Sequence, residues 1–223
     1  MTNGTKICHL TYTHSDYYDA TKIYQSQMKK FFPFDWEHIY TSNKLVKHAN
    51  TIIYNEKDKY PKRLFDSLTA IENEFEYIFF DHEDMFLFKS PNEELINQYI
   101  QYIDLEKVDH IRLIKNDGAI VTQINEIPSL FKISNHSDWI FSIQPSFWKI
   151  NTLKKILSKC FSCNIWELEV KAQRIVKKMT IKCFYAHQNG KKRGIHHFDS
   201  DIYPYVATAI GKGKWNFGEY ENE

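Results

Sequence analysis

Residues 77–88 read YIFFDHEDMFLF, so three carboxylates and an imidazole stand between two apolar runs. Charge placed between buried segments is costly unless something neutralises it. Closely spaced oxygen ligands suit Mg²⁺ or Mn²⁺, ions that often share their coordination with a substrate diphosphate. In an extended chain, residues two apart point the same way, so Asp81 with Glu83, or His82 with Asp84, can reach one ion. The alternative is a charged turn whose polar groups bond to the backbone.

A second pair of carboxylates, Glu167 and Glu169, lies in the stretch NIWELE at 164–169. Asn164 followed three residues later by Glu167 fits a capping box at a helix start, which gives Glu167 a structural role. We therefore favour Glu169 as a general base, with Glu167 as the second candidate. The helix dipole keeps a carboxylate ionised at this end. The alternative is that both are ordinary first-turn acids.

The elements that would position these groups alternate between strands and helices in the first half of the chain. Such alternation predicts βαβ units, a parallel sheet, and ligands bound beyond the carboxyl ends of its strands. Apolar periodicity predicts strands at 6–13, 37–43, 50–56, 76–80 and 108–115, and helices at 17–31, 60–73 and 92–103. In the second half it predicts strands at 139–149 and 181–187, helices at 151–159 and 166–179, and an irregular tail from Gly194 onward.

The composition excludes several classes of protein. With 29 basic and 28 acidic residues the net charge is +1, which argues against a general binder of nucleic acid or anionic membranes. No signal-peptide pattern and no apolar run of membrane-spanning length are present, and we expect the four cysteines to be reduced thiols. We therefore predict a cytoplasmic protein without a transmembrane segment, which leaves peripheral membrane association open.

The order of these motifs resembles that of GT-A-fold glycosyltransferases, in particular small bacterial and viral sugar transferases. The resemblance rests on the acidic element after a buried strand, where DHED replaces a plain D-x-D. It also rests on YTHSDYYD at 12–19, FSIQPSFWKINTLKKIL at 141–157, NIWELE, and GIHHFDSDIYPYVATAIGKGKWN at 194–216. It implies an α/β, GT-A-like single domain over 1–223, with a mostly parallel central sheet flanked by helices. Residues 1–115 would form the nucleotide-sugar-binding half and 116–223 the acceptor-side half.

The same resemblance implies an activity and its residues. The activity is transfer of a sugar from a nucleotide-diphosphate donor to a glycan or polysaccharide acceptor, assisted by Mn²⁺ or Mg²⁺, with inversion through Glu169 or Glu167. The implied metal ligands are Asp84 foremost, with Glu83, Asp81, His196 and His197. The implied donor-binding residues are Thr11, Thr13, His14, Ser15, Asp16, Arg63, Asp81, His82 and Glu83, and the acceptor-binding residues are Gln144 and Trp148.

Plainer interpretations of several of these residues stay open. Ser15 or Asp16 would cap the following helix, Arg63 would be a surface residue, and Trp148 would belong to the core. His196 and His197 would lie in a surface loop.

Two other functions also remain open. A nucleotidyltransferase or another metal-dependent phosphoryl enzyme would use similar carboxylates, although the segment after the first strand lacks the glycines of a phosphate loop. A non-catalytic carbohydrate-binding domain would suit the high aromatic content.

Overall fold

One nine-stranded sheet forms the centre of the protein in the computed structural model, which describes residues 6–193, 197–207, 209–211 and 213–216. The strand order across the sheet is β3-β2-β1-β4-β9-β5-β10-β8-β7. These strands are β1 (Ile7–Tyr12), β2 (Glu37–Ser42), β3 (Asn50–Ile53), β4 (Tyr77–His82), β5 (His110–Arg112), β7 (Val121–Gln123), β8 (Leu130–Ile133), β9 (Ser146–Lys149) and β10 (Cys183–Ala186).

The sheet is mixed, which corrects the expectation of a mostly parallel one. The pairs β3–β2, β2–β1, β1–β4 and β5–β10 are parallel. The pairs β4–β9, β9–β5, β10–β8 and β8–β7 are antiparallel. Because β9 runs against β4, the segment that precedes β9 reaches the edge of the sheet where β1 and β4 end. Segments from both halves of the sequence therefore meet at that edge.

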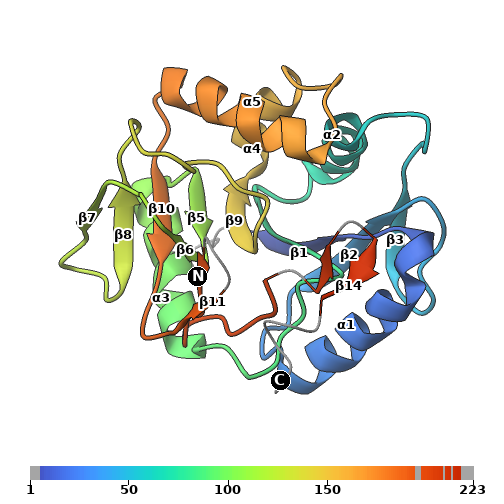
Figure 1. Ribbon diagram of the computed structural model, residues 1–223, viewed down its shortest axis with the longest axis horizontal. Coiled ribbons are helices and arrows are strands. Elements are labelled where there is room, and N and C mark those ends of the chain that lie inside the picture. The colour runs from blue at the N-terminus through green and yellow to red at the C-terminus, as the bar shows by residue number, and fades with distance from the viewer. Residues whose placement is uncertain (1–5, 194–196, 208, 212, 217–223) are drawn as a thin grey trace.

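Helices cover both faces of the sheet. One face packs against α1 (Tyr18–Phe31) and α3 (Glu93–Glu106), and the other against α2 (Tyr60–Ile71), α4 (Ile150–Leu157) and α5 (Ile165–Lys178). Figure 1 shows α2, α4 and α5 grouped together on one side of the sheet. Apolar side chains at helical spacing form each contact face, such as Leu64 and Leu68 of α2, which are 1 % and 0 % exposed.

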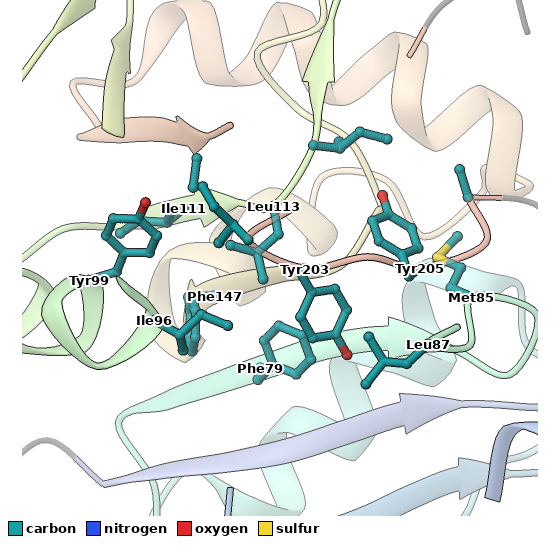
Figure 2. Packing of buried hydrophobic residues seen from close by; sticks show 14 of the residues in the cluster. Phe79, Met85, Leu87, Ile96, Tyr99, Ile111, Leu113, Phe147, Tyr203 and Tyr205 are labelled. Carbon is teal, nitrogen blue, oxygen red and sulfur yellow. The ribbon is translucent and has the colours of Figure 1, made fainter. Parts of the chain in front are cut away.

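The C-terminal segment returns to the core of the N-terminal half. Leu87 and Tyr205 form an antiparallel bridge, and the Val206 N–H donates to the Phe86 carbonyl at 3.0 Å. Figure 2 shows Tyr203 beside Phe79, whose ring centroid lies 5.2 Å away. The smaller elements near this segment are η1 (Ser15–Tyr17), the sheet of β6 (Lys115–Asn116), β11 (Lys192–Arg193) and β12 (His197–Phe198), and the hairpin of β13 (Ile210–Gly211) and β14 (Lys214–Trp215).

The predicted elements are found in the expected order, with two differences that matter for the site. The strand expected at 139–149 is confined to 146–149, and residues 139–145 form an irregular segment. The strand expected to end at Phe80 continues to His82, so Asp81 pairs with Thr11 inside the sheet. None of the helices in the described part of the chain is long and apolar enough to span a bilayer.

Candidate functional site

A cavity of about 720 Å³ lies at the sheet edge where β1 and β4 end. Its floor carries the acidic turn that follows β4, and its walls come from the segment after β1, the segment before β9, the start of α5 and the β13–β14 hairpin. The lining residues are Tyr12, His14, Tyr17, His82, Glu83, Asp84, Met85, Ile143, Gln144, Ile165, Trp166, Glu169, Ile210, Gly211 and Gly213.

The acidic turn brings three metal-ligating side chains together. The Met85 N–H donates to the His82 carbonyl at 3.0 Å and closes the turn. One ligand atom from each of His82, Glu83 and Asp84 lies within 4.8 Å of the others. The three side chains therefore have the donor types and the proximity that a hard divalent cation requires.

Burial sets the protonation of this cluster. It raises the pKa of Asp84 to about 6, and burial together with the nearby Asp84 charge raises the pKa of Glu83 well above its usual value. The Ile210 N–H, 3.4 Å from Asp84 Oδ2, partly opposes the rise for Asp84. A cation bound between the two carboxylates would favour their ionised forms.

His82 is neutral at physiological pH because burial lowers its pKa to about 4. Its Nε2 lies 2.8 Å from the Tyr60 hydroxyl. In the tautomer that donates from Nε2 to Tyr60, Nδ1 keeps its lone pair and can bind a metal.

Asp81 does not line the cavity and is part of a buried polar network. Thr11 Oγ1 donates to its Oδ1 at 2.8 Å, and the Tyr24 hydroxyl donates to its Oδ2 at 2.7 Å. His9 Nε2 lies 3.0 Å from the same oxygen, and Asp81 is 0 % exposed. The structure therefore separates Asp81 from the other acids of DHED, and Thr11 with it, since both side chains are satisfied on the α1 side of the sheet.

The two candidate bases have different surroundings. Glu167 completes the expected capping box, because the Asn164 N–H donates to Glu167 Oε2 at 2.7 Å and the Glu167 N–H donates to Asn164 Oδ1 at 2.9 Å. Glu169 lines the cavity, and the Ile143 N–H donates to its Oε1 at 3.2 Å. Burial raises the pKa of Glu169. Of the two, only Glu169 lines the cavity that holds the acidic turn.

The segment after β1 contributes one of its predicted residues to the cavity. His14 lines it, caps η1 through the Asp16 N–H, and lies 3.0 Å from Glu56 Oε1. The hydroxyl of Thr13 bonds to Thr21 inside the fold at 2.8 Å. Ser15 and Asp16 lie in η1, and neither lines the cavity. His14 therefore caps η1, whereas α1 begins after Tyr17 without a side-chain cap, so neither Ser15 nor Asp16 caps the expected helix.

Arg63 lies outside the cavity and contacts one of its lining residues. Its Nε donates to the Asp58 carbonyl at 2.7 Å, and its Nη1 donates to the hydroxyl of Tyr12, a lining residue, at 3.2 Å. The guanidinium also lies 4.7 Å from the centre of the Tyr54 ring. These contacts hold Tyr12 in position, while Arg63 does not line the cavity.

The two predicted acceptor residues lie in different places, one in the cavity and one in the core. Gln144 lines the cavity and accepts a hydrogen bond from the Tyr205 hydroxyl at 2.9 Å. Trp148 is 1 % exposed and stacks on His110 at 3.8 Å, so it belongs to the core. His196 lies outside the described residues. His197 lies in β12, where its backbone pairs with Asn116 of β6, and its side chain is outside what the structure describes.

Several residues that line the cavity were not predicted as site residues from the sequence, chiefly Tyr12, Trp166, Gly211 and Gly213. Trp166 is 66 % exposed although it is large and apolar, and it lies within NIWELE. A tryptophan on the polar side of an amphipathic helix was the available signal. Gly213 has φ +75°, which favours glycine, so the closely spaced glycines of GKG were the signal for the hairpin.

No family model and no curated protein matches the sequence. Among solved structures, residues 1–349 of TarS from S. aureus superpose with a TM-score of 0.51 at 12 % identity, covering 82 % of this chain and 60 % of that chain. The 4-diphosphocytidyl-2C-methyl-D-erythritol synthase from Anaerococcus prevotii gives 0.53 at 12 % identity and 92 % of both chains. This likeness shows the fold, which is mixed α/β and GT-A-like.

Proposed function

We propose that the protein is a glycosyltransferase that moves a sugar from a nucleotide-diphosphate donor to a glycan or polysaccharide acceptor, with Mn²⁺ or Mg²⁺ and with inversion. One observation carries the proposal: the His82-Glu83-Asp84 cluster and Glu169 line the same cavity. The similarity in fold to TarS, a glycosyltransferase, supports it.

The acidic turn fits a divalent metal shared with a diphosphate. When bound, the ion would neutralise the charge that develops on the leaving diphosphate. His82, Glu83 and Asp84 would hold it. Burial raises the pKa of both Glu83 and Asp84, so their ionised forms are disfavoured without a cation, and a bound cation would favour them. Among the described lining residues none is Lys or Arg, so a diphosphate here needs such a cation. Lys212, between two lining glycines, lies outside the described residues.

Glu169 would act as the base that accepts the proton of the acceptor hydroxyl. The hydrogen bond from the Ile143 N–H to Oε1 fixes the carboxylate, and Oε2 is the oxygen that would face the acceptor. Burial raises the pKa of Glu169, which makes its ionised carboxylate a stronger base. Gln144, held by Tyr205, would donate a hydrogen bond to the acceptor from the neighbouring wall.

A donor-cleavage assay tests the proposal. The purified chain is incubated with Mn²⁺ and a panel of nucleoside-diphosphate sugars, and released nucleoside diphosphate is measured. Calorimetry measures binding of each nucleoside diphosphate with Mn²⁺ and with EDTA. We expect binding that requires metal, and release from one donor class. Absence of both binding and release across the panel would refute the proposal.

A nucleotidyltransferase is the second candidate, because the A. prevotii synthase, a nucleotidyltransferase-like enzyme, matches over 92 % of both chains. The leaving group distinguishes the glycosyltransferase from the nucleotidyltransferase. A nucleotidyltransferase acting on a nucleoside triphosphate releases pyrophosphate, whereas the proposed reaction releases a nucleoside diphosphate. Metal-dependent pyrophosphate release from a triphosphate, without cleavage of any nucleotide sugar, would favour this candidate.

A further inference from the structure

A second cavity, of about 650 Å³, lies beside the C-terminal half of α1 and shares no lining residue with the acidic cavity. It is bounded by the middle of β1, the start of β2, and the segments that precede β2 and β3. Its volume is typical of small-molecule sites. The lining residues are His9, Gln25, Met28, Lys29, Phe32, Phe34, Trp36, His38, Tyr40, Lys47, His48, Ala49 and Asn50.

Flat rings form much of the wall. His9 and His38 are directly paired between β1 and β2, and their rings stack with centroids 4.1 Å apart. Tyr40 stacks on His38 at 4.4 Å, and Phe34 stacks on Trp36 at 4.5 Å. The faces and edges of such rings favour a planar aromatic ligand.

The charged groups of this cavity are basic. Lys29 and Lys47 line it, and no carboxylate is among the described lining residues. Burial lowers the pKa of the lining His38, so the charge of the cavity rests on the two lysines. Neither ammonium group forms an ion pair within the described part of the chain. The helix dipole explains a lysine in the last turn of α1, but it does not explain Lys47, which comes from a separate segment.

Three carboxylates adjoin this lining in sequence or through a hydrogen bond. Asp35, between Phe34 and Trp36, is exposed and does not itself line the cavity. Glu37 accepts a hydrogen bond from Asn50 at 3.3 Å, and Asp81 is bonded within the network that includes His9. Lys29 and Lys47 therefore line one cavity that has no carboxylate in its described wall, which favours an anionic ligand.

One buried polar atom of a lining residue has no hydrogen-bond partner among the described residues. His9 is 0 % exposed and uses Nε2 at Asp81, while its Nδ1 has no hydrogen-bond partner among the described residues. An unsatisfied buried nitrogen is costly. Because Nδ1 is itself buried, a ligand in the cavity does not reach it in this structure, and the preference for an anion rests on the two lysines. A phosphate monoester, with a charge of about −1.5 to −2 at pH 7, matches their two positive charges.

We propose that this cavity, lined by His9, Lys29, Trp36, His38 and Lys47, is a second binding site that takes an aromatic phosphate monoester. It is separate from the acidic cavity, so the proposal does not depend on the transferase activity. The ring lies among Phe32, Phe34, Trp36 and Tyr40, and the phosphate lies near Lys29 and Lys47.

Calorimetry with 1-naphthyl phosphate tests the site, using the full chain with Mn²⁺ and EDTA in separate titrations. We expect one binding event that needs no metal, with inorganic phosphate and 1-naphthol each binding at least about tenfold more weakly. The double variant Lys29→Ala, Lys47→Ala should weaken binding by about tenfold or more. The matched variant Lys22→Ala, Lys44→Ala has the same net charge, changes lysines outside the cavity, and should bind like the wild type.

Three results would each overturn the proposal. The first is no binding of 1-naphthyl phosphate by the wild type. The second is equal affinity of the two double variants, which would assign binding to general surface charge. The third is displacement of 1-naphthyl phosphate by a nucleoside diphosphate with Mn²⁺ but not with EDTA, which would place the probe in the acidic cavity.

Discussion

Replacement of Glu169 by glutamine tests the proposed base most directly. Glutamine has nearly the same shape, and its Oε1 can still accept the hydrogen bond that Ile143 donates at 3.2 Å. The change therefore removes proton-accepting power while keeping the contact that orients the side chain. Loss of a general base costs about 10²–10⁴-fold in rate, or about 3–5 kcal/mol of transition-state free energy.

The assay compares kcat and KM for sugar transfer with calorimetric binding of the nucleoside diphosphate. We expect Glu169→Gln to lower kcat by about 10²-fold or more, with nucleotide affinity unchanged, because the base acts on the acceptor. The matched control is Glu167→Gln, which keeps the capping box since glutamine also serves at that position. If Glu169→Gln keeps more than half of the wild-type kcat, or if both variants lose the same activity, the assignment is wrong.

The pH dependence gives a second readout for the same residue. Burial raises the pKa of Glu169, so the acid limb of kcat/KM should lie above the ordinary glutamate value of about 4.3. A raised carboxyl pKa in the folded state means that stability falls as pH rises through that pKa. Glu169→Gln should therefore melt above the wild type at about pH 8, and the difference should shrink toward about pH 5. The opposite trend in melting temperature would contradict the buried environment.

Three further substitutions probe the rest of the site. Asp84→Asn should weaken Mn²⁺ binding by about tenfold or more by calorimetry, whereas Asp16→Asn, an exposed aspartate outside the cavity, should leave it unchanged. Asp81→Asn should lower the free energy of unfolding by about 3 kcal/mol in urea titrations, because an amide nitrogen in place of one carboxylate oxygen cannot accept the hydrogen bond from Thr11 or Tyr24; a loss below about 0.5 kcal/mol would show that the buried network tolerates the loss of that acceptor. Trp166, an exposed ring that lines the cavity together with Glu169, would stack on the acceptor sugar. Trp166→Ala should then raise KM for the acceptor by about tenfold without changing donor binding, and Trp166→Phe should restore part of it; an unchanged acceptor KM would show that Trp166 does not contact the acceptor.

Local pattern was sufficient to predict the five α-helices of the described residues and seven of the nine strands of the central sheet, but it missed β7 and β8. The capping box at Asn164 and Glu167 is an example, because both partners are three residues apart and the structure forms both hydrogen bonds. The apolar run before the acidic turn likewise predicted β4, which is fully buried. At the start of α5 residue type and spacing were enough, whereas the cap expected at Ser15 or Asp16 is not formed.

Strand direction and side-chain partners depend on contacts between distant segments, and there the predictions failed. Periodicity does not encode direction, so the antiparallel insertion of β9 between β4 and β5 was missed. Asp81 could not be separated from Glu83 and Asp84 by type, because its partners His9 and Tyr24 lie 72 and 57 residues earlier. Residue type left Trp148 open between an acceptor-binding residue and a core residue, and its burial and its stacking on His110 place it in the core.

The return of the C-terminal segment into the N-terminal core has a consequence for biosynthesis. Tyr203 and Tyr205 complete the packing around Phe79 and Leu87, more than a hundred residues earlier in the chain (Figure 2). A ribosome makes the β4 region well before it makes this segment, so the apolar surface of β4 stays incomplete during most of translation. The nascent chain would reach its final packing only after the segment leaves the exit tunnel, and until then that surface is one for chaperones to shield.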